Sequence, residues 1–158
     1  MYGLVADVAA YPQFLPWCAA SEVHEADEAS MRASLTIAKG PLRKRFTTRN
    51  RLFPLRRIEI ELLDGPFEHL NGCWSFDELG DAGARVTLEL DFDVSGAFLR
   101  RTLRPVFSQI GYTMLDDFCQ RARELYRAAG LLVNATRHVK VQVVCATLDR
   151  HSPLSVDV

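Results

Sequence analysis

Apolar and polar residues alternate along most of the chain between Met31 and Val94. Successive side chains of a β-strand point to opposite faces, so this alternation predicts strands with one apolar and one polar face. It is clearest from Arg85 to Val94, where Thr, Glu or Asp separates successive apolar residues. Turn residues divide the region, which predicts an antiparallel sheet of five strands at Met31–Ile37, Arg45–Leu52, Arg57–Leu62, Gly72–Phe76 and Arg85–Val94.

The period of the apolar residues changes to that of a helix between Ala97 and Ala129. Gly130 favours a stop there, and Pro105 predicts a kink or a new start near Leu103, because proline lacks a backbone donor. A sheet with one apolar face and one long amphipathic helix bury each other if the sheet curls around the helix, so we expect an α+β fold. The apolar stripe comprises Leu99, Leu103, Val106 or Phe107, Ile110, Met114, Phe118, Ala122 and Leu125.

The first residues combine a short helix with an aromatic turn. Leu4, Val5 and Val8 have helical spacing, which predicts a helix over Tyr2–Ala10. The turn YPQFLPWC follows, and its two prolines restrict the backbone around several large apolar side chains. Large apolar side chains on a turn favour a role as a lid, a plug or a contact surface.

Four segments of the chain resemble one protein family. They are LVADVAAYPQFLPWC at the start, FTTRN at Phe46–Asn50, LDGPFEHLNG at Leu63–Gly72 with Trp74 and Phe76, and the helix from Leu99 to Tyr126. They are similar to the family of the ribosome-association toxin RatA and the coenzyme Q-binding proteins. The resemblance implies a START-like helix-grip domain of the polyketide cyclase/dehydrase superfamily over residues 1–130. Relatives carry a strand before the first helix, so we expect that strand to be missing here.

Residues 131–158 form a separate tail. The segment Val139–Val158 predicts a β-hairpin and resembles the opening of the RnfH family, which is ubiquitin-like. Two strands are too few to bury a core of their own. The tail is expected either to form its own hairpin, to lack order, or to cover the edge of the Arg85–Val94 strand that the missing strand would leave unpaired.

Length and composition favour one domain in the cytoplasm. The 158 residues are 48% hydrophobic, enough for a single core. We find neither an apolar run that could cross a bilayer nor a secretory signal, so we expect a cytoplasmic protein with at most a peripheral contact to the inner membrane. The cysteines lack zinc-site spacing and are expected to be reduced and mostly buried: Cys18, Cys73, Cys119 and Cys145.

The sequence lacks the residue patterns of a catalytic centre. Its four histidines are isolated, and Asp91 and Asp93 alternate with apolar residues on the expected polar face. The pair Asp116 and Asp117 lies opposite the helix stripe. We therefore expect no catalytic residue, no metal and no cofactor, and fold alone does not confer the cyclase activity after which the superfamily is named.

A pocket for an apolar ligand between sheet and helix is the preferred interpretation. Thr48 and Asn50 share the inward face of their strand with apolar residues, and a buried polar group needs a partner such as a quinone carbonyl. A filled core, in which both bond to the backbone or to water, is the alternative. The predicted ligand-binding residues are Trp74, Phe76, Leu88, Leu90, Phe92, Phe107, Ile110, Met114, Phe118, Thr48 and Asn50, and the entrance is predicted at Phe14, Leu15, Trp17 and Phe67.

Charge is distributed unevenly along the sequence. Residues 1–28 hold five acids and no Lys or Arg, whereas residues 29–58 hold nine Lys or Arg and no acid. Such a cluster attracts phosphates of RNA or of anionic lipids, but a solvated strand face paired with Glu59 and Glu61 is the alternative. The expected polyanion surface, here called the cationic row, comprises Arg43, Lys44, Arg45, Arg49 and Arg51.

Two functions follow from the resemblance. The first is non-catalytic binding of a hydrophobic ligand, ubiquinone or another polyprenyl quinone, in support of respiration. The second is that of a toxin that binds the large ribosomal subunit and blocks subunit association. Ligand binding would use the pocket, and binding of the ribosomal subunit would use the cationic row.

Overall fold

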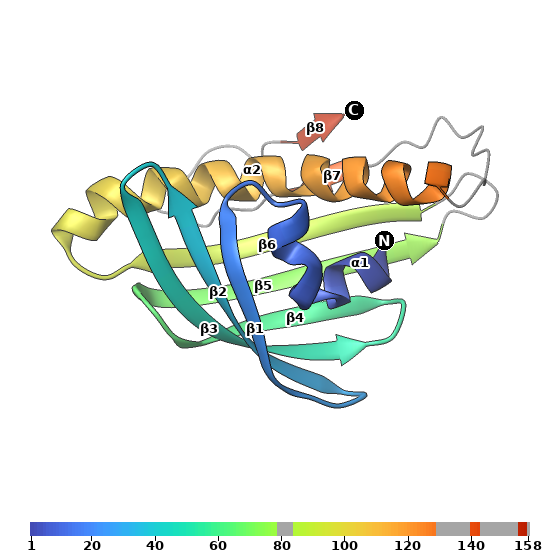
Figure 1. Cartoon of the computed structure of the whole chain (residues 1–158), viewed down its shortest axis with the longest axis horizontal. Helices are drawn as coiled ribbons and strands as arrows, with labels where there is room; N and C mark the ends of the chain where they lie inside the picture. The colour runs from blue at the N-terminus through green and yellow to red at the C-terminus, as the bar shows by residue number, and fades with distance from the viewer. Residues whose placement is uncertain (79–83, 129–139, 143–154, 158) are drawn as a thin grey trace.

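The computed structural model describes residues 1–78, 84–128, 140–142 and 155–157. A curved antiparallel sheet holds one long helix against its concave face (Figure 1). The elements in chain order are α1 (Tyr2–Ala6), the 3₁₀ helix η1 (Val8–Gln13), β1 (Cys18–Ala26), β2 (Ser30–Lys39), β3 (Leu42–Phe53), β4 (Arg57–Asp64), β5 (Phe67–Glu78), β6 (Ala84–Val94), α2 (Ala97–Ala128), β7 (Lys140–Gln142) and β8 (Ser155–Asp157).

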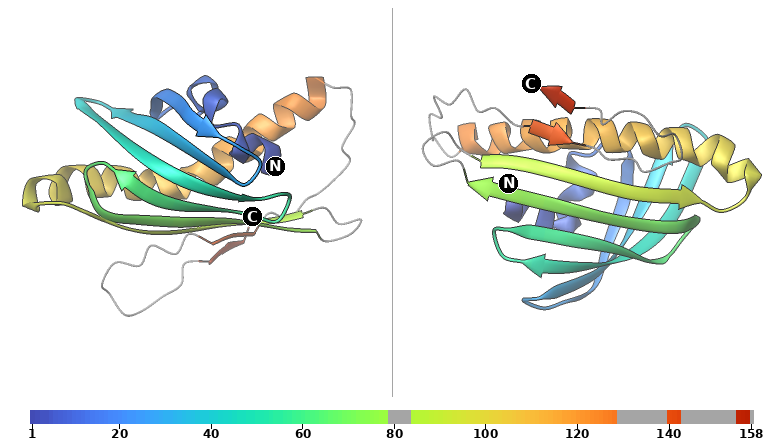
Figure 2. Two further views of the ribbon diagram at one scale, coloured as in Figure 1. Left: turned by 90° about the horizontal axis from the view of Figure 1, so that it is seen from below. Right: turned by 180° about the vertical axis from the view of Figure 1, so that it is seen from behind.

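The six strands β1 to β6 form one sheet in which each strand pairs with its neighbour in sequence. Every pairing is antiparallel, as the period-two pattern predicts. The sheet curls around α2, while α1 and η1 lie next to β1 and α2 (Figure 2). The START-like helix-grip arrangement of an α+β domain is therefore confirmed.

Strand β1 was not predicted from the sequence. Only Cys18 of its nine residues is buried, so its side chains show no alternation between apolar and polar. The strand forms because its backbone pairs with β2, from Cys18 opposite Ile37 to Ala26 opposite Met31. The predicted meander of five strands thus has six.

The helix α2 presents the predicted stripe to the sheet. Leu103, Phe107, Ile110 and Phe118 are at most 4% exposed, whereas Leu125 at the far end is 42% exposed. Of the two predicted alternatives, the new start near Leu103 is wrong, because α2 runs without interruption through Pro105, and the kink stays a prediction. Pro105 is exposed, so the carbonyl that loses its hydrogen bond can be solvated at little cost.

The first helix is shorter than predicted, and part of the aromatic turn is helical. The helix α1 ends at Ala6, and η1 includes Tyr11 and Pro12. The Tyr11 hydroxyl donates a 2.6 Å hydrogen bond to the carbonyl of Val5, which joins the two short helices. Burial raises the pKa of Tyr11 above its ordinary value, so the hydroxyl keeps the proton that it donates.

The described parts of the tail form a small ladder of their own. β7 pairs antiparallel with β8, and the division into a domain of residues 1–130 and a tail stays a prediction. β7 also lies alongside β6 but is not hydrogen-bonded to it (Figure 2). The rest of the predicted RnfH-like segment lies outside the described residues, so that resemblance stays a prediction.

Candidate ligand-binding cavity

A partly enclosed hollow of about 60 Å³ lies between the sheet, α2 and the segment that links η1 to β1. Strands β2 to β6 form its floor, and α2 forms the opposite wall. Most of its wall is apolar, as is usual for small-molecule sites. It is lined by Val8, Tyr11, Trp17, Ala33, Leu35, Phe46, Thr48, Asn50, Ile60, Leu70, Trp74, Leu88, Leu90, Phe107, Ile110 and Met114.

The structure brings most of the predicted ligand-binding residues to this hollow. Phe76, Phe92 and Phe118 do not line it but pack behind its wall; for example, Phe118 makes an edge contact with Trp74 at 5.2 Å between ring centroids. The residues that line it as predicted are Thr48, Asn50, Trp74, Leu88, Leu90, Phe107, Ile110 and Met114.

Several lining residues were not among the predicted ligand-binding residues. Ala33, Leu35, Phe46 and Ile60 stand on the inward faces of their strands, so the period-two pattern contains the signal for them. That pattern gives no indication of Val8, Tyr11 and Trp17, because the approach of η1 and the following loop to α2 depends on tertiary packing.

Two polar side chains in β3 form part of the wall. Thr48 and Asn50 are 5% and 8% exposed, and the Thr48 hydroxyl donates a 3.0 Å hydrogen bond to Oδ1 of Asn50. The inward orientation predicted for both residues is correct. Their mutual bond uses one end of the Asn50 amide, and the other end has no partner among the described residues.

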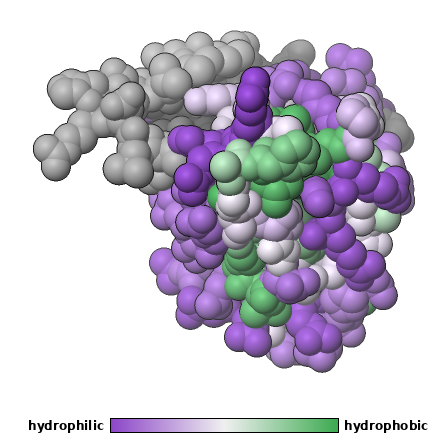
Figure 3. Space-filling model, turned by 90° about the vertical axis from the view of Figure 1, so that its left-hand side faces the viewer, coloured by the Kyte–Doolittle hydropathy of each residue, from purple (hydrophilic) through white to green (hydrophobic). Residues whose placement is uncertain are grey.

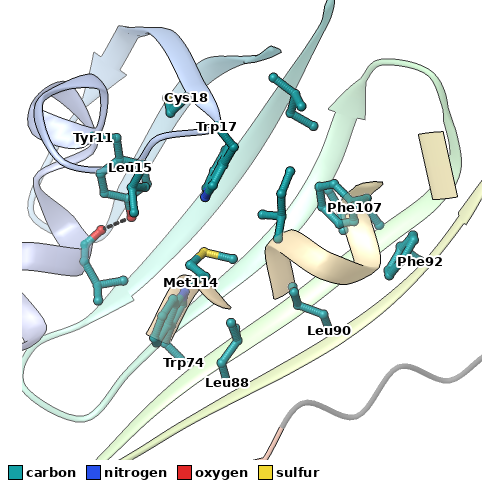
Figure 4. Packing of buried hydrophobic residues seen from close by; sticks show 14 of the residues in the cluster. Tyr11, Leu15, Trp17, Cys18, Trp74, Leu88, Leu90, Phe92, Phe107 and Met114 are labelled. Carbon is teal, nitrogen blue, oxygen red and sulfur yellow. Dashed lines mark hydrogen bonds between the residues drawn. The ribbon is translucent and has the colours of Figure 1, made fainter. Parts of the chain in front are cut away.

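Trp17 contributes a polar atom that has no partner in the described part of the chain. The side chain is 7% exposed, and its indole nitrogen is buried without a hydrogen-bond acceptor. Figure 4 shows the nitrogen on the edge of the ring that faces Met114, a cavity residue of α2. A buried donor left unpaired costs about 1–3 kcal/mol, so an acceptor inside the hollow would relieve a real penalty.

The predicted entrance residues are packed rather than open. Leu15 and Phe67 are 2% and 5% exposed, and Phe67 belongs to the strand β5 rather than to a loop. Phe14 is half-buried and makes an edge contact with Phe118 at 5.1 Å. Of the four predicted entrance residues only Trp17 lines the hollow, so the other three do not mark its opening.

The volume limits what this hollow can hold. An engineered apolar cavity of about 150 Å³ takes up one benzene molecule, and the hollow here is about 60 Å³. A larger ring requires the wall to move. The flexible side chain of Met114 is a part of the wall that can yield without breaking a hydrogen bond, whereas residues 14–17 are held by backbone bonds from Leu15 N to Tyr11 O and from Ala38 N to Trp17 O.

The cationic row is partly paired with acids. Arg45 forms an ion pair with Glu22, and Arg51 forms one with Glu59 at 3.4 Å. Arg43 and Arg49 are exposed and have no acidic partner among the described residues. Lys44 alternates to the opposite face of β3, so the row is not one continuous face.

The outer face of β1 to β3 carries a buried hydroxyl network. Ser34 is 3% exposed, and its Oγ lies 2.7 Å both from Nε2 of His24 and from Oγ1 of Thr47. His24 is also 3.7 Å from Glu22. The order Ser, His and Glu is that of a hydrolase triad, but the Ser34 hydroxyl is shielded from solvent and already bonded to Thr47.

The described residues contain no cluster of three or more His, Cys, Asp or Glu that could hold a metal ion. They also contain no helix that is long and apolar enough to span a membrane. Burial raises the pKa of Cys18 to about 11, so it is a thiol at neutral pH. Cys73 and Cys119 are free but only half-buried, and Cys145 lies outside the described residues.

The end of the molecule where α2 begins has an apolar surface. Phe98, in the first turn of α2, is 78% exposed, and Leu63 near the end of β4 is 39% exposed. Figure 3 looks onto this end and shows apolar side chains gathered among hydrophilic ones. Exposed apolar patches of this kind often mark contact sites.

Comparison with known proteins identifies the family. A family model described as "Polyketide cyclase / dehydrase and lipid transport" matches residues 1–146. The chain belongs to this family. A Pseudomonas aeruginosa protein named "Ribosome association toxin RatA" is 52% identical over 126 residues, which are 80% of this chain and 88% of that protein.

A second relative has a different name. The "Coenzyme Q-binding protein COQ10 homolog B, mitochondrial" of Xenopus laevis is 34% identical over 131 residues, which cover 80% of this chain and 53% of that protein. The chain therefore resembles both groups that the sequence motifs indicate, and the Pseudomonas aeruginosa RatA, at 52% identity, is more similar to it than the Xenopus protein, at 34%.

A solved structure supports the fold. The crystal structure of the Zhui aromatase/cyclase from Streptomyces sp. R1128 has a TM-score of 0.70 with 24% sequence identity, and the match covers 82% of this chain and 88% of that one. At this identity the likeness concerns the fold, and the enzyme's reaction does not carry over.

Proposed function

We propose that the protein binds a hydrophobic small molecule between the sheet and α2, and that this ligand is a polyprenyl quinone such as ubiquinone. The observation that carries the proposal is an apolar cavity whose few polar groups, among them Thr48, Asn50 and Trp17, are buried beside it. The printed name of the Xenopus relative supports a quinone as the ligand.

The proposed mechanism is sequestration without conversion of the ligand. The quinone ring lies between α2 and the sheet, where Leu88, Leu90 and Ile110 exclude water and the amide of Asn50 meets a carbonyl. Because the hollow is smaller than the ring, the side chain of Met114 moves aside to admit it. The first isoprene units follow the ring into the space that this side chain leaves.

Quinone uptake tests this function directly. The purified protein should release quinone on lipid extraction, detected by mass spectrometry, or take up a short-tailed ubiquinone added to it. Ala33→Leu fills the hollow from the 1% exposed Ala33 and should abolish uptake, whereas Ala97→Leu on the exposed start of α2 should not. Circular dichroism checks that both variants fold. A folded wild-type protein that takes up no quinone contradicts the proposal.

The proposed membrane contact lies at the apolar end around Phe98, with the exposed Arg101 nearby in the helix; Arg100 is paired with Glu68 and Asp93. An exposed aromatic ring beside a cation suits an anionic bilayer surface. Phe98→Ser should reduce flotation with vesicles that contain an anionic lipid, and Tyr112→Phe, exposed further along α2, should not. Equal flotation of wild type and both variants would place the contact elsewhere or exclude it.

The second candidate function is association with the large ribosomal subunit. It is supported by the names of the RatA relatives and by the unpaired cations Arg43 and Arg49. The double reversal Arg43→Glu with Arg49→Glu should weaken cosedimentation with the subunit, with strong salt dependence. Reversal of the exposed Arg85 and Arg123 makes the same change of net charge and serves as the control.

Testing both variants for quinone binding and for subunit binding distinguishes the two functions. If both hold, the cavity-filling Ala33→Leu variant binds the ribosomal subunit but no quinone, and the Arg43/Arg49 reversal binds quinone but no subunit. Loss of subunit binding in Ala33→Leu would mean that the ligand controls the ribosomal contact. Equal, negligible subunit binding before and after the reversal would leave the cationic row as a solvated strand face.

A further inference from the structure

The polar groups that line the cavity are not balanced between donors and acceptors. The Tyr11 hydroxyl donates to the carbonyl of Val5, and the Thr48 hydroxyl donates to Asn50 Oδ1, so both hydroxyl protons are used within the protein. The indole nitrogen of Trp17 carries a proton and has no acceptor among the described residues. An indole can only donate. The unmet requirement in this wall is therefore for an acceptor.

A second indole lies across the same hollow. Trp74 is 2% exposed, and Figure 4 shows its nitrogen on the ring edge that faces Met114, as the nitrogen of Trp17 also does. The two rings come from opposite sides of the cavity, Trp17 from the loop before β1 and Trp74 from β5. A ligand ring that displaced the side chain of Met114 would have an N–H group directed at it from each side.

We propose that the cavity recognises its ligand through hydrogen-bond acceptors, with Trp17 as the principal donor, and so binds an oxidised quinone in preference to the quinol. This inference rests on the proposed quinone-binding function and specifies which form is held. A quinone presents two carbonyl oxygens that only accept. A quinol presents two hydroxyl groups, each of which also has a proton to place.

The wall gives the quinol protons few acceptors. Leu88, Leu90 and Ile110 offer none, and the oxygens of Tyr11, Thr48 and Asn50 are each already held in a hydrogen bond within the protein. A quinol hydroxyl that accepts from the Trp17 N–H has to direct its own proton at this wall, and leaving that proton unpaired corresponds to roughly a tenfold or greater loss of affinity. A tenfold preference for the oxidised form lowers the midpoint potential of the bound two-electron couple by about 30 mV.

The affinities of the two forms test the proposal. The full-length protein is titrated without oxygen with a short-tailed ubiquinone and separately with its quinol, and binding is followed by calorimetry. Wild type should bind the quinone at least about tenfold more tightly. Trp17→Phe should lose most of that preference, whereas Tyr112→Phe, which removes a polar atom from an exposed aromatic outside the cavity, should keep it.

The chain has only two tryptophans, and both line the cavity, so the indole N–H signals report the contact directly. In a protein with ¹⁵N-labelled tryptophan, the quinone should shift the Trp17 indole proton downfield, as a new hydrogen bond does, and the quinol should shift it less. This measurement needs no substitution. If Trp17→Phe fails to fold, benzothienylalanine at position 17 preserves the shape of the ring and removes the N–H.

The possible outcomes distinguish a failure of this inference from a failure of the proposed quinone-binding function. Equal affinity for quinone and quinol, or an unchanged Trp17 indole signal in the quinone-bound protein, overturns the inference and leaves quinone binding in place. Binding of neither form overturns both. A preference that survives removal of the Trp17 N–H in a folded protein overturns the assignment to Trp17.

Discussion

Gly72 faces Leu90 across two neighbouring strands so closely that a Cβ atom at position 72 would lie 2.9 Å from Leu90 Cδ2. The same Cβ would lie 3.4 Å from Cδ1 of Ile60, on the other neighbouring strand. Leu90 and Ile60 both line the cavity. The missing side chain of Gly72 therefore lets these two side chains lie back against the sheet and leave the hollow open.

The first prediction is that Gly72→Ala weakens ligand binding while the protein stays folded. The methyl group pushes the flexible ends of Leu90 and Ile60 into the hollow, so the fold survives and quinone affinity falls several-fold. Gly3→Ala is the control, because a Cβ at Gly3 meets no atom within 4 Å. Calorimetric titration measures the affinity and thermal unfolding measures the stability; unchanged affinity would show that the ligand does not use this space.

The second prediction concerns the turn between β4 and β5. Gly65 has φ +146°, and a Cβ there would lie 2.6 Å from Phe46 Cβ and 3.1 Å from Phe46 Cα. Because these atoms belong to the strand β3 and cannot move aside, Gly65→Ala is expected to lower the free energy of unfolding by more than about 2 kcal/mol. Chemical denaturation measures the loss.

Gly40→Ala is the matched control for this substitution. Gly40 also has a positive φ, +58°, but a Cβ there meets open space, so only the backbone cost of about 1–2 kcal/mol applies. Equal losses at the two positions would mean that the close approach of Gly65 to Phe46 contributes nothing.

The third prediction is a pH dependence at Asp117. Its Oδ2 atom is buried without a hydrogen-bond partner in the described part of the chain, and burial, followed by the neighbouring Asp116 carboxylate, raises the pKa of Asp117. A raised pKa in the folded state favours the protonated acid. Its contribution to stability is therefore present below the unfolded pKa of about 3.9 and is lost as pH rises through the folded pKa.

Asp117→Asn should accordingly raise Tm at pH 7 and give little or no gain near about pH 3, where the acid is already protonated. Glu89→Gln, which neutralises an exposed carboxylate on β6, controls for the change in net charge. An equal gain in Tm at both pH values, or the same gain in the control, would show that the gain does not come from the burial of the Asp117 carboxylate.

The fourth prediction concerns the edge of the sheet. In the described residues β6 pairs on one side with β5, and β7 lies alongside its other edge. Exposed strand edges recruit other strands, so removing residues 138–158 is expected to raise aggregation or to change the oligomer seen by light scattering. Unchanged mass, solubility and thermal stability would show that the tail does not protect this edge.

The sheet was predictable where one face is buried and the other is wet. In β6, Val86, Leu88 and Phe92 are all at most 1% exposed, as their spacing indicates. β1 lacks that contrast, so its pairing with β2 leaves no trace in the pattern of hydrophobic residues. Lys44 was placed with the outward cations because of its charge, although its position in the alternation assigns it to the other face.

The cavity was predictable only in part, for a related reason. Periodicity identifies the residues that face inward but not which of them touch one another, so Phe92 and Phe118 could not be distinguished from Leu90 and Met114. The unpaired nitrogen of Trp17 is a property of three-dimensional packing. The sequence places Trp17 on a proline-restricted turn, and only the fold shows that its N–H group lacks an acceptor.

The small volume of the cavity has a consequence for the rate of ligand exchange. If the wall must move before a ring can enter, then only the open fraction of molecules is competent, and the apparent affinity is reduced by that fraction. The association rate then levels off at high ligand concentration, at the rate of opening, instead of rising without limit. Dissociation requires the same motion, so the residence time of a bound molecule depends on how often the wall formed by Trp17 and its neighbours opens.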